Sequence, residues 1–275
     1  MAGEFDAHER RLWAGRAQAY RDSFAALCGY TAPALLDAAG VTEGGSEGLR
    51  VLDVGTGPGT VAAAAAGRGA LVTAVDAEPG MAELAAARVP GADVRVALLP
   101  SLPFADGAFD AVVANFVVNH VEHPAAALAE LLRVVRPGGR VAATVWSGSP
   151  RNAAMNVFNQ ALDAAGVERP VLPGVPAELN FERTPEGFAG LADEAGWKGA
   201  DCREVAWTHR PDPEVWWSGV AGGVANMGMV VAGQPPAVIA QVKEHYDRLA
   251  VDLLGADGRL ELPAVALLAG ATRVG

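Results

Sequence analysis

The sequence has few cysteines, few basic residues and no long apolar run. Cys28 and Cys202 match no metal-ligand spacing, and we expect two reduced thiols in the reducing cytoplasm. Only 21 Lys and Arg stand against 32 Asp and Glu, without a local basic cluster, which argues against nucleic acid as a partner. The charged start lacks the apolar stretch of a signal peptide, and no window offers the ~18 apolar residues of a membrane span. These absences argue against a nucleic-acid partner and a membrane span. They do not fix the oligomeric state, for which a homodimer is one option.

The composition is that of a folded protein with a substantial core. Of the 275 residues, 51% are apolar and 19% are charged. Residues 5–39 place apolar side chains at helical spacing, broken at Pro33, and predict two or three helices that end at Gly40. We therefore interpret residues 1–48 as an N-terminal helical cap within a single 275-residue domain.

Residues 49–146 alternate short apolar runs with helical patterns. Continuous apolar runs are typical of strands that are covered on both faces, and their alternation with helices predicts parallel βαβ units. The expected fold class is α/β, a doubly wound, Rossmann-like sheet of seven strands. We expect the strands at residues 49–55, 70–76, 92–99, 109–117, 140–146, 201–209 and 260–273.

The regular alternation of strand and helix patterns ends after Trp146. Residues 147–166 and 186–197 resemble helices, the latter with Thr184 as a plausible N-cap, and a Pro- and Gly-rich stretch lies between them. Further helical patterns precede the last strand. We expect residues 147–183 and 210–259 to be helical inserts that form a lid and shape the substrate pocket.

The stretch VLDVGTGPGT, residues 51–60, carries the chemistry. A glycine turn between a strand and a helix lets backbone N–H groups approach a ligand. Dinucleotide sites use G-x-G-x-x-G, but here Thr60 occupies the third glycine position. Asp53 precedes the first glycine by two residues, and a carboxylate there would repel a pyrophosphate by on the order of 1–4 kcal/mol. A ligand with a cationic amino-acid end reverses the sign of that interaction.

A second acid supports the same ligand. Asp76 ends the next strand about 20 residues after the turn, where a carboxylate accepts both ribose hydroxyls. A nucleoside with a cationic tail is S-adenosylmethionine, which becomes S-adenosylhomocysteine when it gives up its methyl group. The sequence therefore predicts S-adenosylmethionine as the cofactor.

Four segments in order also resemble a known family: VLDVGTGPGT, VDAEPGM, LPSLPFADGAFDAVVANFVVNHV and LLRVVRPGGRVAATVW. They are similar to the class I S-adenosylmethionine-dependent methyltransferases, especially the branch of ubiquinone/menaquinone C-methyltransferases and small-molecule enzymes of secondary metabolism. The likeness covers residues 49–146 well and the N-terminal helices loosely. It implies that residues 49–146 bind the cofactor, that the seventh strand is antiparallel, and that a methyl group passes to an oxygen, nitrogen or carbon of a small, aromatic or apolar metabolite.

The resemblance also implies roles for individual residues. Asp53 would be directed toward the amino group of the methionine portion, either directly or through a water molecule. Asp76 would hold the ribose, and Arg16 would pair with the carboxylate of the cofactor. Leu98 stands where the family usually has an acid, and the hydrogen bond that this acid accepts from the adenine amino group is therefore not expected from a leucine side chain. The full expected cofactor site comprises Arg16, Tyr20, Asp53, Gly55, Thr56, Gly57, Asp76, Ala77, Met81, Leu98, Leu99 and Asn115.

His120, in NHVEHP, follows the fourth expected strand, where family members often carry a histidine that faces the substrate. An imidazole there could act as general base, or it could be an ordinary hydrogen-bonded loop histidine. Trp13, Trp146 and Trp216 could line an apolar substrate pocket, although a core role is as consistent with the pattern. No His, Asp or Glu spacing indicates a metal site.

Two other functions remain open on the sequence. An NAD(P)-dependent oxidoreductase would use the same sheet, but it predicts a third glycine at position 60. A non-catalytic scaffold that binds the cofactor is favoured only by the missing acid at Leu98.

Overall fold

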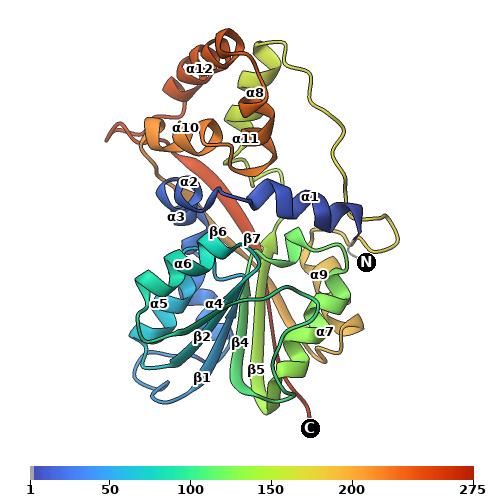
Figure 1. The fold of residues 1–275 in the computed structure, drawn as a ribbon. Helices are drawn as coiled ribbons and strands as arrows, with labels where there is room; N and C mark the ends of the chain where they lie inside the picture. The colour runs from blue at the N-terminus through green and yellow to red at the C-terminus, as the bar shows by residue number, and fades with distance from the viewer. Residues whose placement is uncertain (1–2) are drawn as a thin grey trace.

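The protein, described over residues 3–275 by a computed structural model, is built on one seven-stranded sheet (Figure 1). The order is β3-β2-β1-β4-β5-β7-β6, and β7 runs antiparallel to both β5 and β6. This confirms the expected fold class, including the antiparallel last strand. The strands are β1 (Arg50–Val54), β2 (Leu71–Asp76), β3 (Asp93–Val96), β4 (Phe109–Asn115), β5 (Val135–Trp146), β6 (Asp201–His209) and β7 (Leu262–Thr272).

Helices cover both faces of the sheet. Two apolar clusters fill these layers, one beneath α4 and α5 and the other beneath α7 and α9. In the second layer, the indole N–H of Trp197 donates to the carbonyl of Leu128 at 2.9 Å and ties the end of α9 to α7. These helices, with α6 beside β2 and β3, are α4 (Ala32–Ala38), α5 (Thr60–Gly67), α6 (Pro79–Arg88), α7 (Pro124–Val134) and α9 (Pro185–Glu194).

A second group of helices stands beyond the carboxyl ends of the parallel strands, where β6 and β7 extend toward it (Figure 1). Its core holds Phe158, Trp216 and Tyr246, which are fully buried. Across residues 3–275 no single helix has both the length and the apolar composition of a membrane span; α10 and α11 meet these criteria only as a pair bent by 69°. The group comprises α8 (Asn156–Ala164), α10 (Pro213–Ala221), α11 (Ala225–Ala232) and α12 (Pro236–Val251).

The N-terminal segment lies between the sheet and these upper helices over residues 4–29, and its last helix, α4, packs against one face of the sheet (Figure 1). It forms four helices rather than the two or three that the spacing predicts, because short breaks at Gly15, Ser23 and Tyr30 divide it. Gly40, at a φ of 72°, follows the last of them as expected. They are α1 (Glu4–Trp13), α2 (Ala17–Asp22), α3 (Ala25–Gly29) and α4.

Several element boundaries differ from the sequence expectations. β5 begins at Val135, before the Pro-Gly-Gly stretch, because Val135 already pairs with Phe109 of β4. β4 ends at Asn115 because Phe116 takes a φ of 59°, outside the range of a strand. α8 begins only at Asn156, nine residues after its expected start. The hydroxyl of Thr184 accepts from the N–H of Gly187, which confirms it as the N-cap of α9.

Candidate active site

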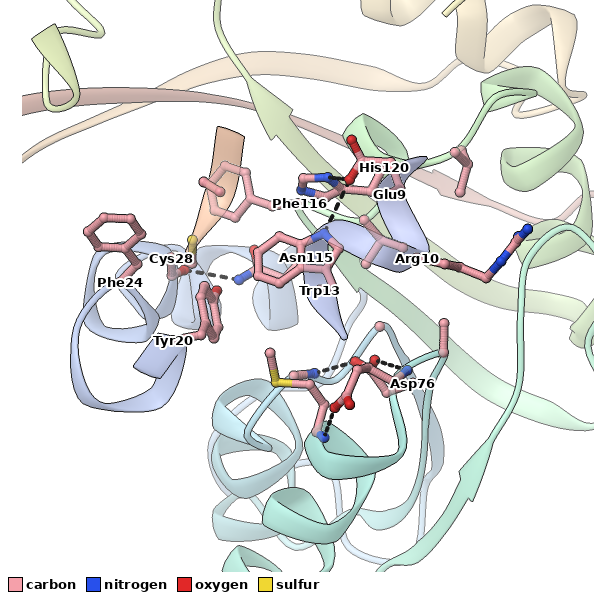
Figure 2. Close-up of a pocket in the computed structure, with 18 of the residues that line it drawn as sticks. Glu9, Arg10, Trp13, Tyr20, Phe24, Cys28, Asp76, Asn115, Phe116 and His120 are labelled. Carbon is pink, nitrogen blue, oxygen red and sulfur yellow. Dashed lines mark hydrogen bonds and ion pairs between the residues drawn. The ribbon is translucent and has the colours of Figure 1, made fainter. Parts of the chain in front are cut away.

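A cavity of about 580 Å³ opens at the carboxyl ends of β1, β2 and β4. α1 and α2 cover one side of it (Figure 2), and α11 together with Asn152, Ala154 and Met155 forms another. Of the sixteen residues that the sequence nominates, the cavity brings together Trp13, Tyr20, Gly55, Gly57, Asp76, Ala77, Met81, Leu98, Leu99, Asn115, His120 and Trp146. Arg16, Asp53, Thr56 and Trp216 do not line it.

The glycine turn forms part of the cavity floor. Gly55 and Gly57 have φ angles of 64° and 54°, in the left-handed region that disfavours side chains. A Cβ on Gly55 would lie 2.3 Å from a methyl of Val117, and one on Gly57 would lie 3.7 Å from the ring of Tyr20. The turn therefore presents bare backbone to the cavity, with Tyr20 above it.

Gly55→Ala is expected to lower the free energy of unfolding by about 2–5 kcal/mol, since it adds a left-handed alanine and an overlap with Val117. Urea denaturation measures the effect. Gly44→Ala is the matched control, because Gly44 has a φ of 70° and open space around it. This control substitution should lower the free energy of unfolding by only about 1–2 kcal/mol. Equal losses for the two variants would contradict close packing at Gly55.

Asp76 bridges the turn and the loop after β2. Its Oδ2 accepts from the N–H of Gly57 at 2.8 Å, and its Oδ1 accepts from the N–H of Glu78 at 2.9 Å. Burial raises the pKa of this carboxyl above its ordinary value, and the nearby charge of Glu78 adds to the increase. Each oxygen keeps a further lone pair for the cavity. Asp76 is thus placed to accept hydrogen bonds from two neighbouring hydroxyls, as the sequence predicts for ribose.

Glu78 is a cavity residue that the sequence reasoning missed. Its Oε2 accepts from the N–H of Met81 at 2.7 Å and caps α6, and its Oε1 accepts from the N–H of Gly15 at 3.4 Å. The acid before Pro79 was a visible N-cap signal. This carboxylate connects the sheet to the N-terminal helices.

Asp53 corrects the sequence expectation. It is 1% exposed and lies beneath the turn, where its Oδ2 accepts from the hydroxyl of Thr56 at 2.7 Å; its Oδ1 is buried without a partner. Neither residue faces the cavity, because the strand alternation turns Asp53 into the core. Burial raises the pKa of Asp53 to about 7. Its charge can reach a ligand through the turn but not by direct contact.

The buried carboxyl predicts a pH-dependent stability. Because the pKa of Asp53 rises from 3.8 in the unfolded chain to about 7, the protonated form favours folding. The contribution of Asp53 to the free energy of unfolding is complete below pH 4. It falls by on the order of 1 kcal/mol per pH unit as the pH rises toward 7. Asp53→Asn should remove that slope in urea titrations between pH 5 and 8, whereas the exposed Asp93→Asn should keep it. Parallel profiles for wild type and Asp53→Asn would contradict the raised pKa.

Two further expectations are corrected. Trp216 is fully buried, with its ring 4.5 Å from that of Phe24 and 5.7 Å from that of Phe158, so it belongs to the upper core and not to a substrate pocket. Arg16 lies against Gly223 of the α10–α11 connection, with its Nε buried and unpartnered. Arg16 is the N-cap residue of α2 and does not line the cavity.

Asn115 lines the cavity, but its polar atoms are engaged in the scaffold. Its Oδ1 accepts from the hydroxyls of Thr31 and Thr144 at 2.7 Å each, and its Nδ2 donates to the carbonyl of Cys28 at 2.9 Å. These bonds join β4, β5 and the N-terminal helices. Beside it, burial raises the pKa of Tyr20 well above its ordinary value, so that the phenol is neutral.

His120 lies in the single turn η1 (Val118–His120), at the far side of the cavity from Asp76 (Figure 2). Its Nδ1 is 2.8 Å from Oε2 of Glu9, and the same oxygen accepts from the indole N–H of Trp13 at 3.2 Å. The ring of Trp13 stands edge-on to His120 and to Tyr20 at 5.2 and 5.4 Å. Sequence reasoning missed Glu9; its i, i+4 spacing from Trp13 was the available signal.

Aromatic side chains form the remaining wall. Phe116 stacks on Trp146 with ring centroids 4.1 Å apart, and both line the cavity. Phe116 and Ala225, each with a φ of 59°, are the non-glycine residues with positive φ within residues 3–275, and both line this cavity. Strain of this kind concentrates at ligand sites.

The electrostatics of the floor suit a cation. The charged groups that act on the buried carboxyls are other carboxylates, Asp76 on Asp53 and Glu78 on Asp76. A pyrophosphate would be repelled here, whereas S-adenosylmethionine brings a sulfonium and an ammonium. Within residues 3–275 no group of three His, Cys, Asp or Glu side chains is placed to hold a metal ion. The bare backbone of the glycine turn and the carboxylate of Asp76 fit S-adenosylmethionine.

A seven-stranded sheet with an antiparallel last strand, and an acid-lined site at its glycine turn, define the class I S-adenosylmethionine-dependent methyltransferases. Comparison with known proteins agrees with this class. Residues 52–143 match the family profile described as Methyltransferase domain. The demethylmenaquinone methyltransferase of Renibacterium salmoninarum is 33% identical over 189 residues, which are 68% of this chain and 74% of that protein. The chain belongs to the quinone-methyltransferase-like branch of the class I S-adenosylmethionine-dependent methyltransferases.

Solved structures share the fold at low sequence identity. Phosphoethanolamine N-methyltransferase 2 of Haemonchus contortus, in complex with S-adenosylhomocysteine, has a TM-score of 0.57 at 16% identity, covering 100% of this chain and 61% of that one. The [4+2]-cyclase SpnF has a TM-score of 0.51 at 19% identity, and the match covers 90% of this chain and 81% of that one. At these identities the likeness establishes the fold alone.

Proposed function

We propose that the protein transfers the methyl group of S-adenosylmethionine to a hydroxylated aromatic acceptor, a phenol or hydroquinone, in secondary metabolism. The observation that carries the proposal is one continuous cavity with Asp76 and the glycine turn at one side, and an aromatic wall with His120 at the other. A methyl donor and a flat acceptor can meet in such a space. The Renibacterium relative is a demethylmenaquinone methyltransferase by name, and this supports an acceptor of this chemistry.

Separate groups of residues bind the methyl donor and the acceptor. Asp76 and the turn at Gly55 and Gly57 bind the donor, and Ala77, Met81, Leu98 and Leu99 surround its base. When bound, S-adenosylmethionine supplies an electrophilic methyl on a positively charged sulfur, so the protein contributes mainly alignment, worth about 7–11 kcal/mol. Phe116 and Trp146 hold the acceptor ring.

His120 acts as the base in this proposal. Its imidazole accepts the proton of the acceptor hydroxyl, which leaves a negative charge shared between the oxygen and the ring carbons. Either atom then becomes a competent nucleophile. Residues 49–146 form the donor-binding part of the domain, and residues 3–48, 147–183 and 210–259 cover it and exclude water.

Methyl transfer from labelled donor tests the proposal. The protein is incubated with S-adenosyl-[methyl-¹⁴C]methionine and a panel of 1,4-naphthohydroquinone, catechol, simple phenols, indoles and amines. Label is expected in the hydroquinone or phenol products. Donor binding without transfer to any acceptor would favour a scaffold, and calorimetric binding of NADH alone would favour an oxidoreductase.

A further inference from the structure

We infer that Glu9 is the positioning residue for His120, so that helix α1 completes the catalytic base when it covers the cavity. This inference rests on the proposed function. Glu9 is buried at 7% exposure, and its Oε2 lies 2.8 Å from Nδ1 of His120. Because a carboxylate only accepts hydrogen bonds, Nδ1 carries the proton and the lone pair of Nε2 is left for the acceptor.

The surroundings of Glu9 and His120 restrict the orientation of both side chains. The indole N–H of Trp13 donates to the same carboxylate oxygen at 3.2 Å, which orients Glu9 from its own helix. The imidazole is half-buried, with 34% of its side chain exposed, and it lines the cavity. Figure 2 shows Glu9 between the two rings, while Arg10 extends away from them.

Helix α1 does not need this pair to stay in place. The carboxylate of Glu122 accepts from the N–H groups of Phe5 and Asp6 at 3.2 and 3.5 Å, and Asp6 accepts in return from the N–H of Glu122 at 2.8 Å. His8 also pairs with Asn226 of α11 at 3.2 Å. Two independent contacts therefore hold α1, and the third places a buried carboxylate behind a cavity-lining imidazole.

The charge of Glu9 matters in the proton step. The acceptor hydroxyl gives its proton to Nε2 and keeps the O–H electron pair, which forms the new bond to the methyl group from the oxygen or from a ring carbon. The imidazolium later releases the proton to water. The Glu9 carboxylate stabilises that imidazolium. Among the other charged groups, Asp6 and Arg10 of α1 line the cavity, with Arg10 extending away from the ring, and Glu122 and His123 follow η1 in the chain. The cavity-lining residues of α11 and of the segment 152–155 are all neutral.

Glu9→Gln removes the negative charge of residue 9 but keeps its hydrogen bond, because the glutamine oxygen can still accept from Nδ1–H and hold α1. The variant therefore tests whether Glu9 acts on His120 beyond attaching α1 to it. With the panel acceptor that the wild type methylates fastest, kcat is expected to fall about 10-fold. The KM for S-adenosylmethionine should stay unchanged, and the acid limb of the kcat/KM profile should move to lower pH. Glu4→Gln, an exposed acid on the same helix, is the matched control and should behave as wild type.

Nitrogen NMR of ¹⁵N-histidine protein with S-adenosylhomocysteine gives a readout without turnover. The His120 signals, assigned by their loss in His120→Ala, should report the Nδ1-protonated tautomer in wild type and a mixture in Glu9→Ala. An Nε2-protonated wild type, or a Glu9→Gln enzyme with the kcat and pH profile of Glu4→Gln, would overturn the inference while methyl transfer stands. A wild type that methylates no acceptor would overturn the proposed function and this inference with it.

Discussion

Asp76→Ala is expected to weaken the binding of S-adenosylmethionine at least about 100-fold. The carboxylate has one free lone pair on each oxygen for the ribose hydroxyls, and hydrogen bonds to a charged acceptor contribute about 1.5–3 kcal/mol each. The substitution also releases the N–H groups of Gly57 and Glu78, which Asp76 now holds at 2.8 and 2.9 Å. Both the ligand contact and the shape of the turn are lost together.

Isothermal titration calorimetry at pH 7.5 measures the loss. Asp93→Ala is the control, because Asp93 lies on the neighbouring strand β3 as an exposed partner of Arg95. Its affinity should match that of the wild type. Circular dichroism establishes that Asp76→Ala is folded. A dissociation constant within about threefold of the wild type would remove Asp76 from the donor site.

His120→Ala is expected to lower kcat about 100-fold or more while the affinity for S-adenosylmethionine stays unchanged. General bases contribute about 10²–10⁴ in rate, and the donor site around Asp76 lies across the cavity from the imidazole. The variant keeps Glu9 and Trp13 in place. Its residual rate should rise with pH, as hydroxide and spontaneous ionisation of the acceptor replace the base.

His123→Ala provides the comparison, since His123 is an exposed histidine three residues further along the same loop. Steady-state kinetics with the same acceptor should give wild-type kcat for this control. If His120→Ala also retained full turnover, the acceptor would need no base from this residue.

The sheet could be predicted from the sequence because its strands are local signals. VLDV, LVTAVD and DAVVAN are continuous apolar runs whose burial on both faces requires a layer of helices on each side. The placement of Gly55, Gly57 and Asp76 at one edge follows directly, since parallel strands bring their carboxyl ends together. This part of the site depends on topology alone.

The misplaced residues depend on packing, which a linear pattern does not contain. Asp53 was assigned to the ligand from its charge, yet the alternation of β1 turns it under the glycine turn toward Thr56. Trp216 has the same apolar character as Trp146, and only the arrangement of α8, α10 and α12 decides that it fills the core. Glu9 was missed because 111 residues separate it from His120.

A crystal structure of the protein with S-adenosylhomocysteine is the most direct measurement of the central claim, that the carboxylate-rich floor beside the glycine turn binds an adenosyl amino acid. The ribose hydroxyls should lie within 2.5–3.0 Å of the Asp76 carboxylate oxygens, the expected range for such bonds. The amino-acid end should lie against Gly55 and Gly57 beneath Tyr20. Density for the ligand elsewhere, with nothing bound between Asp76 and the turn, would contradict this claim.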